Sequence, residues 1–296
     1  MPRRAGAQQL SVYARRSRQW TRWLGRNWAR WTYGRRIEPT WLELTRHVVP
    51  IAGLPDAFHG FRIVHLSDLH ASHKLPHGYL HEAVELANSQ QPDLIALTGD
   101  FIHKGYRHVR AVARLLAALS APAGVFAVLG NHDFSVRSAL GLRRHRRLHL
   151  AVEQALTDHG ITVLRNKFHE VRHGNESLHL VGVDDLWSRR CDLDAALGAI
   201  PRHLPRVILA HNPQTIERLQ GERCDLMLSG HTHGGQVNWP GLGRVFMSPK
   251  GRRFAAGMFQ HSGSYLYVHR GVGFGLRFRF GVRPEVAVLE LQTPQR

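Results

Sequence analysis

Short apolar runs, separated by polar turns and by segments with helical periodicity, follow one another from residue 61 to the end of the chain. The periodic segments predict helices at 77–90 and 107–119, a long helix that ends near 160, and a helix near 192–200. Strands that alternate with helices are typical of layered α/β proteins. Because no internal repeat divides the pattern, it favours one α/β domain, placed at 58–292. The apolar runs predict strands at 61–66, 94–98, 124–129, 161–165, 168–173, 178–183, 207–210, 226–229 and 286–291.

The first part of the chain has a different pattern, in which aromatic and apolar residues recur at helical spacing. Arginines fall mostly on the opposite side of this helix. Pro39, Pro50 and the turns that follow separate the segment from the domain, so residues 1–50 are expected to form a basic helical arm. The residues that share one helical stripe are Tyr13, Trp20, Leu24, Trp28 and Trp31, with Trp23 at its edge.

Charge is concentrated in this arm. The 296 residues include 40 Lys and Arg against 22 Asp and Glu, a net charge of +18. Residues 1–36 hold ten of the arginines, no acidic residue and four of the seven tryptophans. A basic helix with an aromatic face suits the surface of an anionic membrane. The alternatives are a disordered tail, a helix packed on its own domain, or a nucleic-acid contact, although no recognisable nucleic-acid-binding module follows.

Other compositional features exclude several classes of protein. The hydrophobic share of 43% is too high for a disordered chain. Cys191 and Cys224 alone cannot form a disulfide framework, so a reducing compartment is expected. No run approaches the ~20 apolar residues that span a bilayer, and no apolar core of a signal peptide is evident. With the basic arm, these features favour a peripheral protein on the cytoplasmic face of the cell membrane.

Residues with metal-binding side chains follow five of the predicted strands. Because strand ends in open α/β sheets meet at a crevice, these residues are expected to form one site. Carboxylates, imidazoles and an amide without thiolates suit Mn²⁺, Fe²⁺, Zn²⁺ or Co²⁺ rather than a structural zinc. A set this large suits two ions, which can clamp a phosphoryl group and activate water. In chain order the segments are Asp68-x-His70, Gly99-Asp100, Gly130-Asn131-His132-Asp133, Ala210-His211-Asn212 and Gly230-His231-Thr232-His233.

Together these positions resemble the motifs of the calcineurin-like metallophosphoesterase superfamily over about residues 60–292. The motifs are Asp68-x-His70, Gly99-Asp100, Gly130-Asn131-His132-Asp133, His211 and Gly230-His231-Thr232-His233. The resemblance implies a four-layer α/β/β/α sandwich with a dinuclear metal centre. One ion would be held by Asp68, His70 and His233. The other would be held by Asn131, His211 and His231, and Asp100 would bridge the two.

The same resemblance implies that His132 acts as a general acid or stabilises the transition state. Asp133 would orient His132. Since every motif position is intact, we expect an active phosphodiesterase or pyrophosphatase. A nucleotide or nucleic-acid phosphoesterase with a polyanion-binding arm, and a non-enzymatic membrane scaffold, are the alternatives.

A narrower resemblance links four segments to the membrane-associated bacterial YkuE/YaeI branch of this superfamily. That branch includes the LpxG-type hydrolases of UDP-2,3-diacylglucosamine in lipid A synthesis, so the resemblance implies a lipid-linked diphosphate substrate. Its members often begin with a transmembrane segment or a twin-arginine signal, and the basic arm stands in their place here. The segments are 182–187, 231–236, 270–273 and 283–286.

Three further residues are candidates for contacts with the substrate, or else ordinary loop residues. His103 follows Asp100 closely, Asn212 follows His211, and Arg270 precedes a glycine turn. A basic run at 143–147, expected at the start of the long helix, either faces solvent or contacts phosphate head groups.

Overall fold

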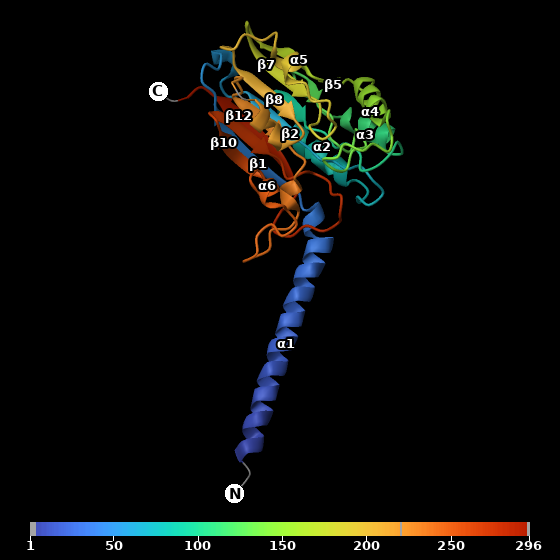
Figure 1. Cartoon of the computed structure of the whole chain (residues 1–296), viewed down its shortest axis with the longest axis vertical. Helices are drawn as coiled ribbons and strands as arrows, with labels where there is room; N and C mark the ends of the chain where they lie inside the picture. Colours follow the sequence, from blue (N-terminus) through green and yellow to red (C-terminus); the bar gives the residue numbers. More distant parts are fainter. Residues whose placement is uncertain (1–3, 220, 295–296) are drawn as a thin grey trace.

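The computed structural model describes residues 4–219 and 221–294 and shows a long N-terminal helix attached to an α/β domain (Figure 1). The helix is α1 (Arg4–Arg36), and only its backbone is described before residue 20. The predicted positions of Tyr13 and of the arginines before residue 20 on the helix therefore lie outside the side chains that the structure describes. The domain follows from Glu38 onward, beginning with the 3₁₀ turn η1 (Glu38–Thr40).

Six strands form the first sheet, in the order β1-β12-β2-β3-β4-β5. All neighbours are parallel except β12 and β2, which are antiparallel. The carboxyl ends of β2, β3 and β4 therefore meet at one edge of the sheet. The strands are β1 (Glu43–Pro50), β2 (Arg62–Leu66), β3 (Leu94–Leu97), β4 (Val125–Ala127), β5 (Thr162–Val163) and β12 (Glu285–Gln292).

The second sheet also has six strands, in the order β10-β11-β9-β8-β7-β6. Its central strands β7, β8, β9 and β11 are parallel, and an antiparallel partner closes each edge. The ends of β8 and β9 thus lie at the same edge of this sheet. The strands are β6 (Lys167–His173), β7 (Glu176–Val183), β8 (Arg206–Ala210), β9 (Leu226–Ser229), β10 (Gly257–His261) and β11 (Ser264–Val268).

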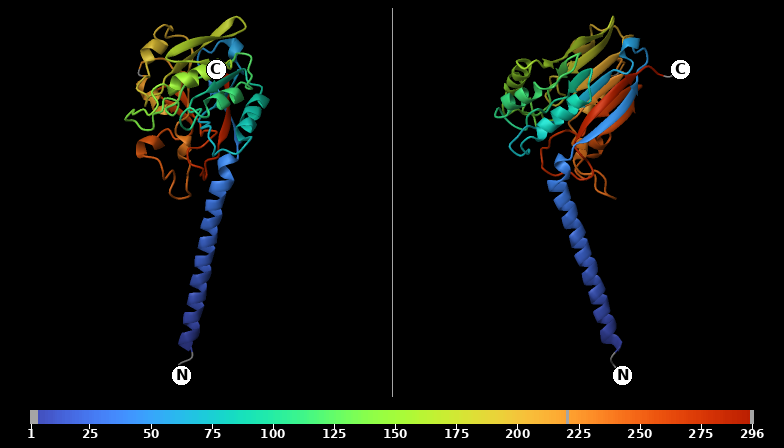
Figure 2. Two further views of the ribbon diagram at one scale, coloured as in Figure 1. Left: turned by 90° about the vertical axis from the view of Figure 1, so that its right-hand side faces the viewer. Right: turned by 180° about the vertical axis from the view of Figure 1, so that it is seen from behind.

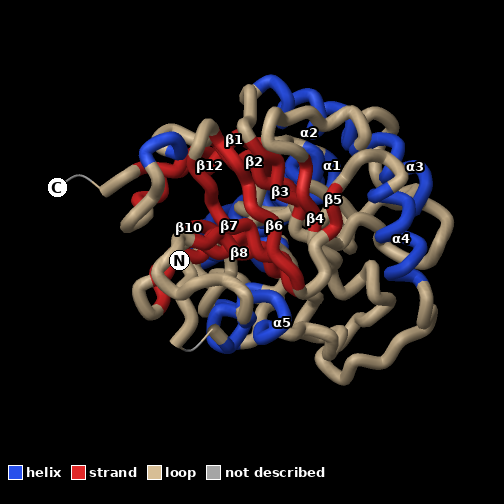
Figure 3. The backbone as a smooth tube through the Cα atoms, turned by 90° about the horizontal axis from the view of Figure 1, so that it is seen from above, coloured by secondary structure: helices blue, strands red, loops and turns tan. Residues whose placement is uncertain are grey.

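Helices cover the outer face of each sheet (Figures 2 and 3). The first sheet packs its apolar face, including Leu97, on Val112 and its neighbours in α2, α3 and α4. The two sheets pack on each other through residues such as Val128 and Leu209, and the second sheet packs on Leu197 of α5. These three buried apolar layers confirm the predicted α/β/β/α sandwich. The helices are α2 (Tyr79–Ser89), α3 (Val109–Leu116), α4 (Leu148–Thr157), α5 (Leu193–Leu197) and α6 (Pro249–Arg252), with 3₁₀ turns η2 (Asp56–Phe58), η3 (Pro213–Arg218) and η4 (His233–Gly235).

Strands β10 and β11 were not placed individually from the sequence, and two further elements differ from the prediction. Strand β1 was not predicted, and it lies within the 1–50 segment assigned to the arm, although all eight of its residues pair with β12. It is an edge strand with mostly half-buried side chains, so it lacks an apolar run. Helix α4 begins at Leu148, so the basic run at 143–147 precedes the helix instead of starting it.

Helix α1 projects away from the domain and touches it only near its C-terminal end among the described residues (Figure 1). There Gly34 O accepts a hydrogen bond from Arg279 N at 2.8 Å, and Tyr33 contacts the ring of Phe280. Its tryptophans Trp20, Trp23, Trp28 and Trp31 are each at least half exposed. None of the helices in the described part of the chain combines the length and apolar composition needed to cross a membrane.

Candidate metal centre

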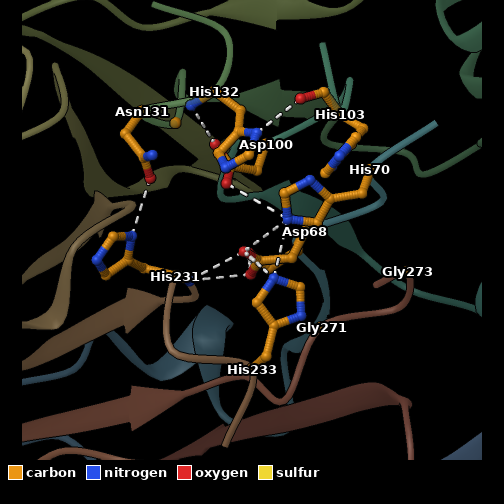
Figure 4. A network of polar contacts seen from close by, with 12 residues as sticks. Asp68, His70, Asp100, His103, Asn131, His132, His231, His233, Gly271 and Gly273 are labelled. Atoms are coloured by element: carbon orange, nitrogen blue, oxygen red, sulfur yellow. Dashed lines mark hydrogen bonds and ion pairs between the residues drawn. The ribbon is translucent and has the colours of Figure 1, made fainter. Parts of the chain in front are cut away.

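Five loops at the ends of β2, β3, β4, β8 and β9 bring the predicted ligands together at one end of the sandwich (Figure 4). Every predicted ligand except His231 is buried, and His231 is partly so. Five of the ligands have positive φ, a backbone conformation that non-glycine residues adopt at some cost. The five are Asp68, His70, Asp100, His231 and His233.

Asp68, His70 and His233 form the first cluster of the centre. The Nε2 atoms of His70 and His233 lie 2.9 Å apart, and His233 Nε2 lies 3.3 Å from Asp68 Oδ1. Two imidazole nitrogens at this distance can share one proton at most. A cation between them and the carboxylate would use both lone pairs.

Asn131, His211 and His231 form the second cluster. Asn131 Oδ1 lies 3.1 Å from His211 Nε2 and 2.9 Å from His231 Nδ1. His211 Nδ1 donates to the carbonyl oxygen of Thr98 at 2.6 Å, which directs the other ring nitrogen into the centre.

Asp100 lies between the two clusters. Its Oδ2 atom is 3.5 Å from His70 Nε2 and 3.4 Å from His211 Nε2. One carboxylate oxygen therefore faces a histidine of each cluster. This is the geometry that a bridging ligand requires.

The electrostatics of the centre fit divalent cations. Burial lowers the pKa of His70 and His233 well below the ordinary value of 6.5, which leaves neutral imidazoles that are able to bind metal. Burial opposes a charge on His211 as well, but Asp100 and the other carboxylates outweigh it and raise the pKa of His211 well above 6.5. Without metal, the cluster thus retains a proton to balance its carboxylates. Neutral imidazoles, carboxylates and an amide oxygen fit Mn²⁺, Fe²⁺ or Zn²⁺.

Two glycines allow the loops to approach these carboxylates. A Cβ atom on Gly230 would lie 1.9 Å from Ser67 Oγ and 2.2 Å from Asp68 Oδ2. A Cβ atom on Gly130 would lie 2.2 Å from Asp100 Oδ1. Both glycines precede predicted ligand segments, so the absence of a side chain is part of each motif.

His132 lies beside the centre and is held from two sides. Its backbone N–H donates to Asp100 Oδ1 at 2.8 Å, and its ring Nδ1 donates to the carbonyl oxygen of His103 at 2.7 Å. The His132 ring centroid lies 4.7 Å from that of His70. Its Nε2 atom is therefore the ring nitrogen left for chemistry.

Asp133 does not have the role that the sequence suggested. Its carboxylate accepts backbone N–H groups of Gly130 at 2.9 Å, Asp100 at 2.8 Å and Phe101 at 3.1 Å. The His103 carbonyl, rather than Asp133, orients the His132 ring. Asp133 instead ties the loop after β3 to the loop after β4, because a carboxylate can accept several hydrogen bonds at once.

The three candidate substrate contacts have different surroundings. The His103 ring lies 5.5 Å from that of His132, and burial, then His132 and Arg137, lower its pKa to about 4. Asn212 accepts from Gln214 N at 3.0 Å, and its Nδ2 atom is buried without a hydrogen-bond partner in the described part of the chain.

Arg270 is not brought to the centre. Its guanidinium group pairs with Glu285 at 2.6 Å and with Glu43 of β1 at 2.7 Å. Two carboxylates thus neutralise its charge, and the arginine links β1 to β12.

Sequence reasoning missed a different arginine, Arg279. Its guanidinium group is fully buried, donates to Gly273 O at 2.7 Å and Gly271 O at 3.1 Å, and has one nitrogen 3.4 Å from His233 Nδ1. Its charge adds to burial and to His70 in lowering the pKa of His233. A single arginine in a glycine-rich stretch has no spacing that would have marked it.

A family model for calcineurin-like phosphoesterases matches residues 61–235. The chain therefore belongs to this family of metallophosphoesterases and is a hydrolase.

Bacterial relatives define the branch more closely. The chain is 38% identical to phosphodiesterase YaeI of Escherichia coli, over 86% of this chain and 90% of that protein. It is 34% identical to the uncharacterized metallophosphoesterase YkuE of Bacillus subtilis, over 88% and 89%. It is 31% identical to UDP-2,3-diacylglucosamine pyrophosphatase LpxG of Chlamydia trachomatis, over 88% and 92%. These relatives confirm the resemblance to the YkuE/YaeI branch.

Proposed function

We propose that this hydrolase uses two divalent metal ions to cleave a phosphodiester or diphosphate bond in a lipid-linked substrate at a membrane surface. The observation that carries the two-ion proposal is the position of Asp100. A single carboxylate oxygen, Oδ2, faces both His70 and His211 at similar distances. A site for one ion would need only one of these clusters.

In this proposal each cluster holds one ion. Asp68, His70 and His233 hold the first, and Asp100 bridges to the second. When bound, the ions would supply Lewis-acid activation of the phosphate and of water. The remaining ligands, which hold the second ion, are Asn131, His211 and His231.

His132 is proposed to protonate the leaving-group oxygen. The His103 carbonyl fixes its Nδ1 proton, and the half-buried ring stands against the first cluster. His132 Nε2 is then the atom that carries and delivers the catalytic proton. Asp133 supports this indirectly by holding the loop that carries His132.

A mostly apolar cavity of about 240 Å³ beside His231 supports a substrate with an apolar part. Its walls include Trp187, Phe246 and Phe254. Asn212 also lines it, and the Asn212 Nδ2 atom has no hydrogen-bond partner among the described residues. The name of LpxG, a UDP-2,3-diacylglucosamine pyrophosphatase, makes that lipid A precursor our specific substrate proposal.

We also propose that α1 attaches the protein to an anionic membrane on the cytoplasmic face. The exposed tryptophans from Trp20 to Trp31 support this, because such side chains favour the region of the lipid head groups. The ten arginines of residues 1–36 would contact the anionic lipids.

The test is metal-dependent hydrolysis of bis-p-nitrophenyl phosphate by the Mn²⁺-loaded protein. Asp100→Ala and His231→Ala should abolish it, since each removes a proposed ligand. Activity that persists in both variants, or none in the unaltered protein with any divalent ion, would contradict the proposal.

A substrate panel tests the lipid assignment. It contains UDP-2,3-diacylglucosamine, glycerophosphodiesters, cyclic nucleotides and DNA. Preferred hydrolysis of DNA or cyclic nucleotides would instead support the nucleotide or nucleic-acid phosphoesterase, with the basic arm binding the polyanion.

A further inference from the structure

A second cavity, of about 380 Å³, opens beside His132. His103 and His132 form the part of its wall that adjoins the metal centre, and both lie close to His70. The rest of the wall comes from the loop before α4 and from the two residues after His103. Among the described residues, no carboxylate lines the cavity. Four of the lining residues are cationic, namely Lys104, Arg137, Arg143 and Arg144.

The loop that closes this cavity is held in place by its own contacts. Val136 and Arg143 form a bridge between its two arms, and His145 N donates to Ser135 Oγ at 3.2 Å. Arg143 also donates to Ser188 O and lies over the ring of Phe134 at 5.6 Å. These contacts fix the loop, so the cationic wall has a defined shape.

The four cations of this wall differ in their contacts. Arg143 is held by its hydrogen bond to Ser188 O, and Arg137 donates to His103 O at 3.3 Å. Lys104 and Arg144 are exposed residues that line the cavity from two different segments. Charged nitrogens that converge on a concave surface are suited to phosphate oxygens.

The neighbouring arginines argue for a specific subsite. Arg146 and Arg147 belong to the same basic run and are exposed, yet neither lines the cavity. Because the cavity is concave and shares His132 with the catalytic centre, a group bound there would belong to the reacting molecule. A flat layer of lipid head groups would contact Arg146 and Arg147 equally well.

We propose that this cavity is a second anion subsite, which binds a phosphate group adjacent to the one that is cleaved. The proposal rests on the proposed function, and it defines the substrate class as molecules with two neighbouring phosphates rather than simple monophosphate diesters. Lys104 and Arg144 are the residues that recognise the second phosphate.

The experiment compares two matched ligands, diphenyl diphosphate and diphenyl phosphate, which differ by one phosphate. Their inhibition constants are measured against bis-p-nitrophenyl phosphate hydrolysis by the Mn²⁺-loaded full chain. Lys104→Ala with Arg144→Ala should reduce the preference for the diphosphate about ten-fold. The control, Arg146→Ala with Arg147→Ala, removes the same charge and should keep the preference.

A ratio of two inhibition constants cancels any general loss of activity in a variant. No preference for the diphosphate in the unaltered protein, or an equal loss in both double variants, would overturn the proposal. Weaker binding to phosphatidylglycerol vesicles in both variants, with the preference intact, would assign the run to lipid head groups and overturn it too.

The outcome is separable from that of the proposed function. If the unaltered protein hydrolyses nothing, the proposed function fails, and the same two ligands are titrated calorimetrically into the same Mn²⁺-loaded proteins. The ratio of their dissociation constants then shows whether the cavity binds a second phosphate.

Discussion

Gly230 and the Asp68 carboxylate illustrate how closely the centre is packed at the scale of single residues. The glycine has no room for a Cβ atom, because Ser67 Oγ and Asp68 Oδ2 occupy that position. Its neighbour His231 donates its backbone N–H to Asp68 Oδ2 at 3.0 Å. The glycine therefore sets the distance between Asp68, a candidate ligand from the first sheet, and the candidate ligand segment that begins with His231 in the second.

We predict that Gly230→Ala weakens manganese binding by at least about ten-fold, since the added methyl group displaces the Asp68 carboxylate. Isothermal titration of Mn²⁺ measures the change. Gly275→Ala is the matched control, because a Cβ atom there meets only His103 Cε1 at an ordinary 3.7 Å. Unchanged affinity in Gly230→Ala would show that Asp68 does not hold metal.

A second residue-scale prediction concerns acid stability. His149 is buried against Phe134, and burial, then Arg165, lowers the pKa of His149 to about 4. Below pH 6.5 the unfolded chain binds a proton at this position and the folded chain does not, so stability falls as the pH falls toward 4. The loss is about 1.4 kcal/mol for each pH unit.

His149→Phe should remove this loss, because the ring packs on Phe134 and the His149 Nδ1 atom has no partner to lose among the described residues. Urea unfolding of the metal-free protein at several pH values measures it. Above pH 7.5 the two free energies should differ by a constant amount. Parallel slopes between pH 6.5 and 4.5 would contradict the assignment.

At the scale of elements, α1 and β1 belong to different parts of the molecule although they are consecutive. Strand β1 pairs along its whole length with β12 and buries Val49 between the sheets. Among residues 20–36 of α1, whose side chains are described, most are exposed, and Tyr33 and Gly34 contact the domain. The sandwich depends on the strand and not on the outer helix.

We predict that deletion of residues 1–30 changes the thermal unfolding midpoint by no more than a few degrees. Deletion of residues 1–50 should lower it by more than about 10 °C or prevent folding, because β12 loses one of its two neighbouring strands and Val49 is removed. Differential scanning calorimetry of both truncations measures this. Equal midpoints would mean that β1 is dispensable.

The sequence predicted those elements that carry an apolar run or a helical period. Candidate ligands such as Asp100 were recognisable because each follows a buried strand at a point where strand ends meet. Strand β1 was missed because its sequence mixes charged and apolar residues at a sheet edge. Arg279 was missed because its importance comes from burial beside His233, a contact made across the fold. The role predicted for Asp133 was wrong for the same reason: its partners are backbone N–H groups that only the fold brings close.

At the scale of the whole molecule, the arm and the domain divide the charge between them. Ten of the arginines lie in residues 1–36, on a helix that extends away from the sandwich (Figure 1). Four cations of the domain line a cavity beside the centre. In our proposals, membrane binding and substrate binding therefore belong to separate sets of basic residues.

We predict that the full chain sediments with vesicles rich in phosphatidylglycerol and that the chain without residues 1–30 does not. Trp20→Ala with Trp28→Ala should weaken binding about ten-fold, through loss of apolar contact. Higher salt should weaken binding further by screening the arginines. Equal sedimentation of the full and truncated chains would contradict a membrane role for α1.

Arg279 connects helix α1 to the candidate metal centre, and this connection bears on the reaction rate at a membrane. Its backbone N–H binds Gly34 of α1, and its guanidinium group lies beside His233 of the centre. An enzyme resting on a bilayer through α1 would hold its reactive groups at a nearly constant height above the lipids. Turnover would then depend on the number of substrate molecules per unit of surface area. Dilution of the substrate with inert lipid would slow the reaction even when its total concentration stays the same.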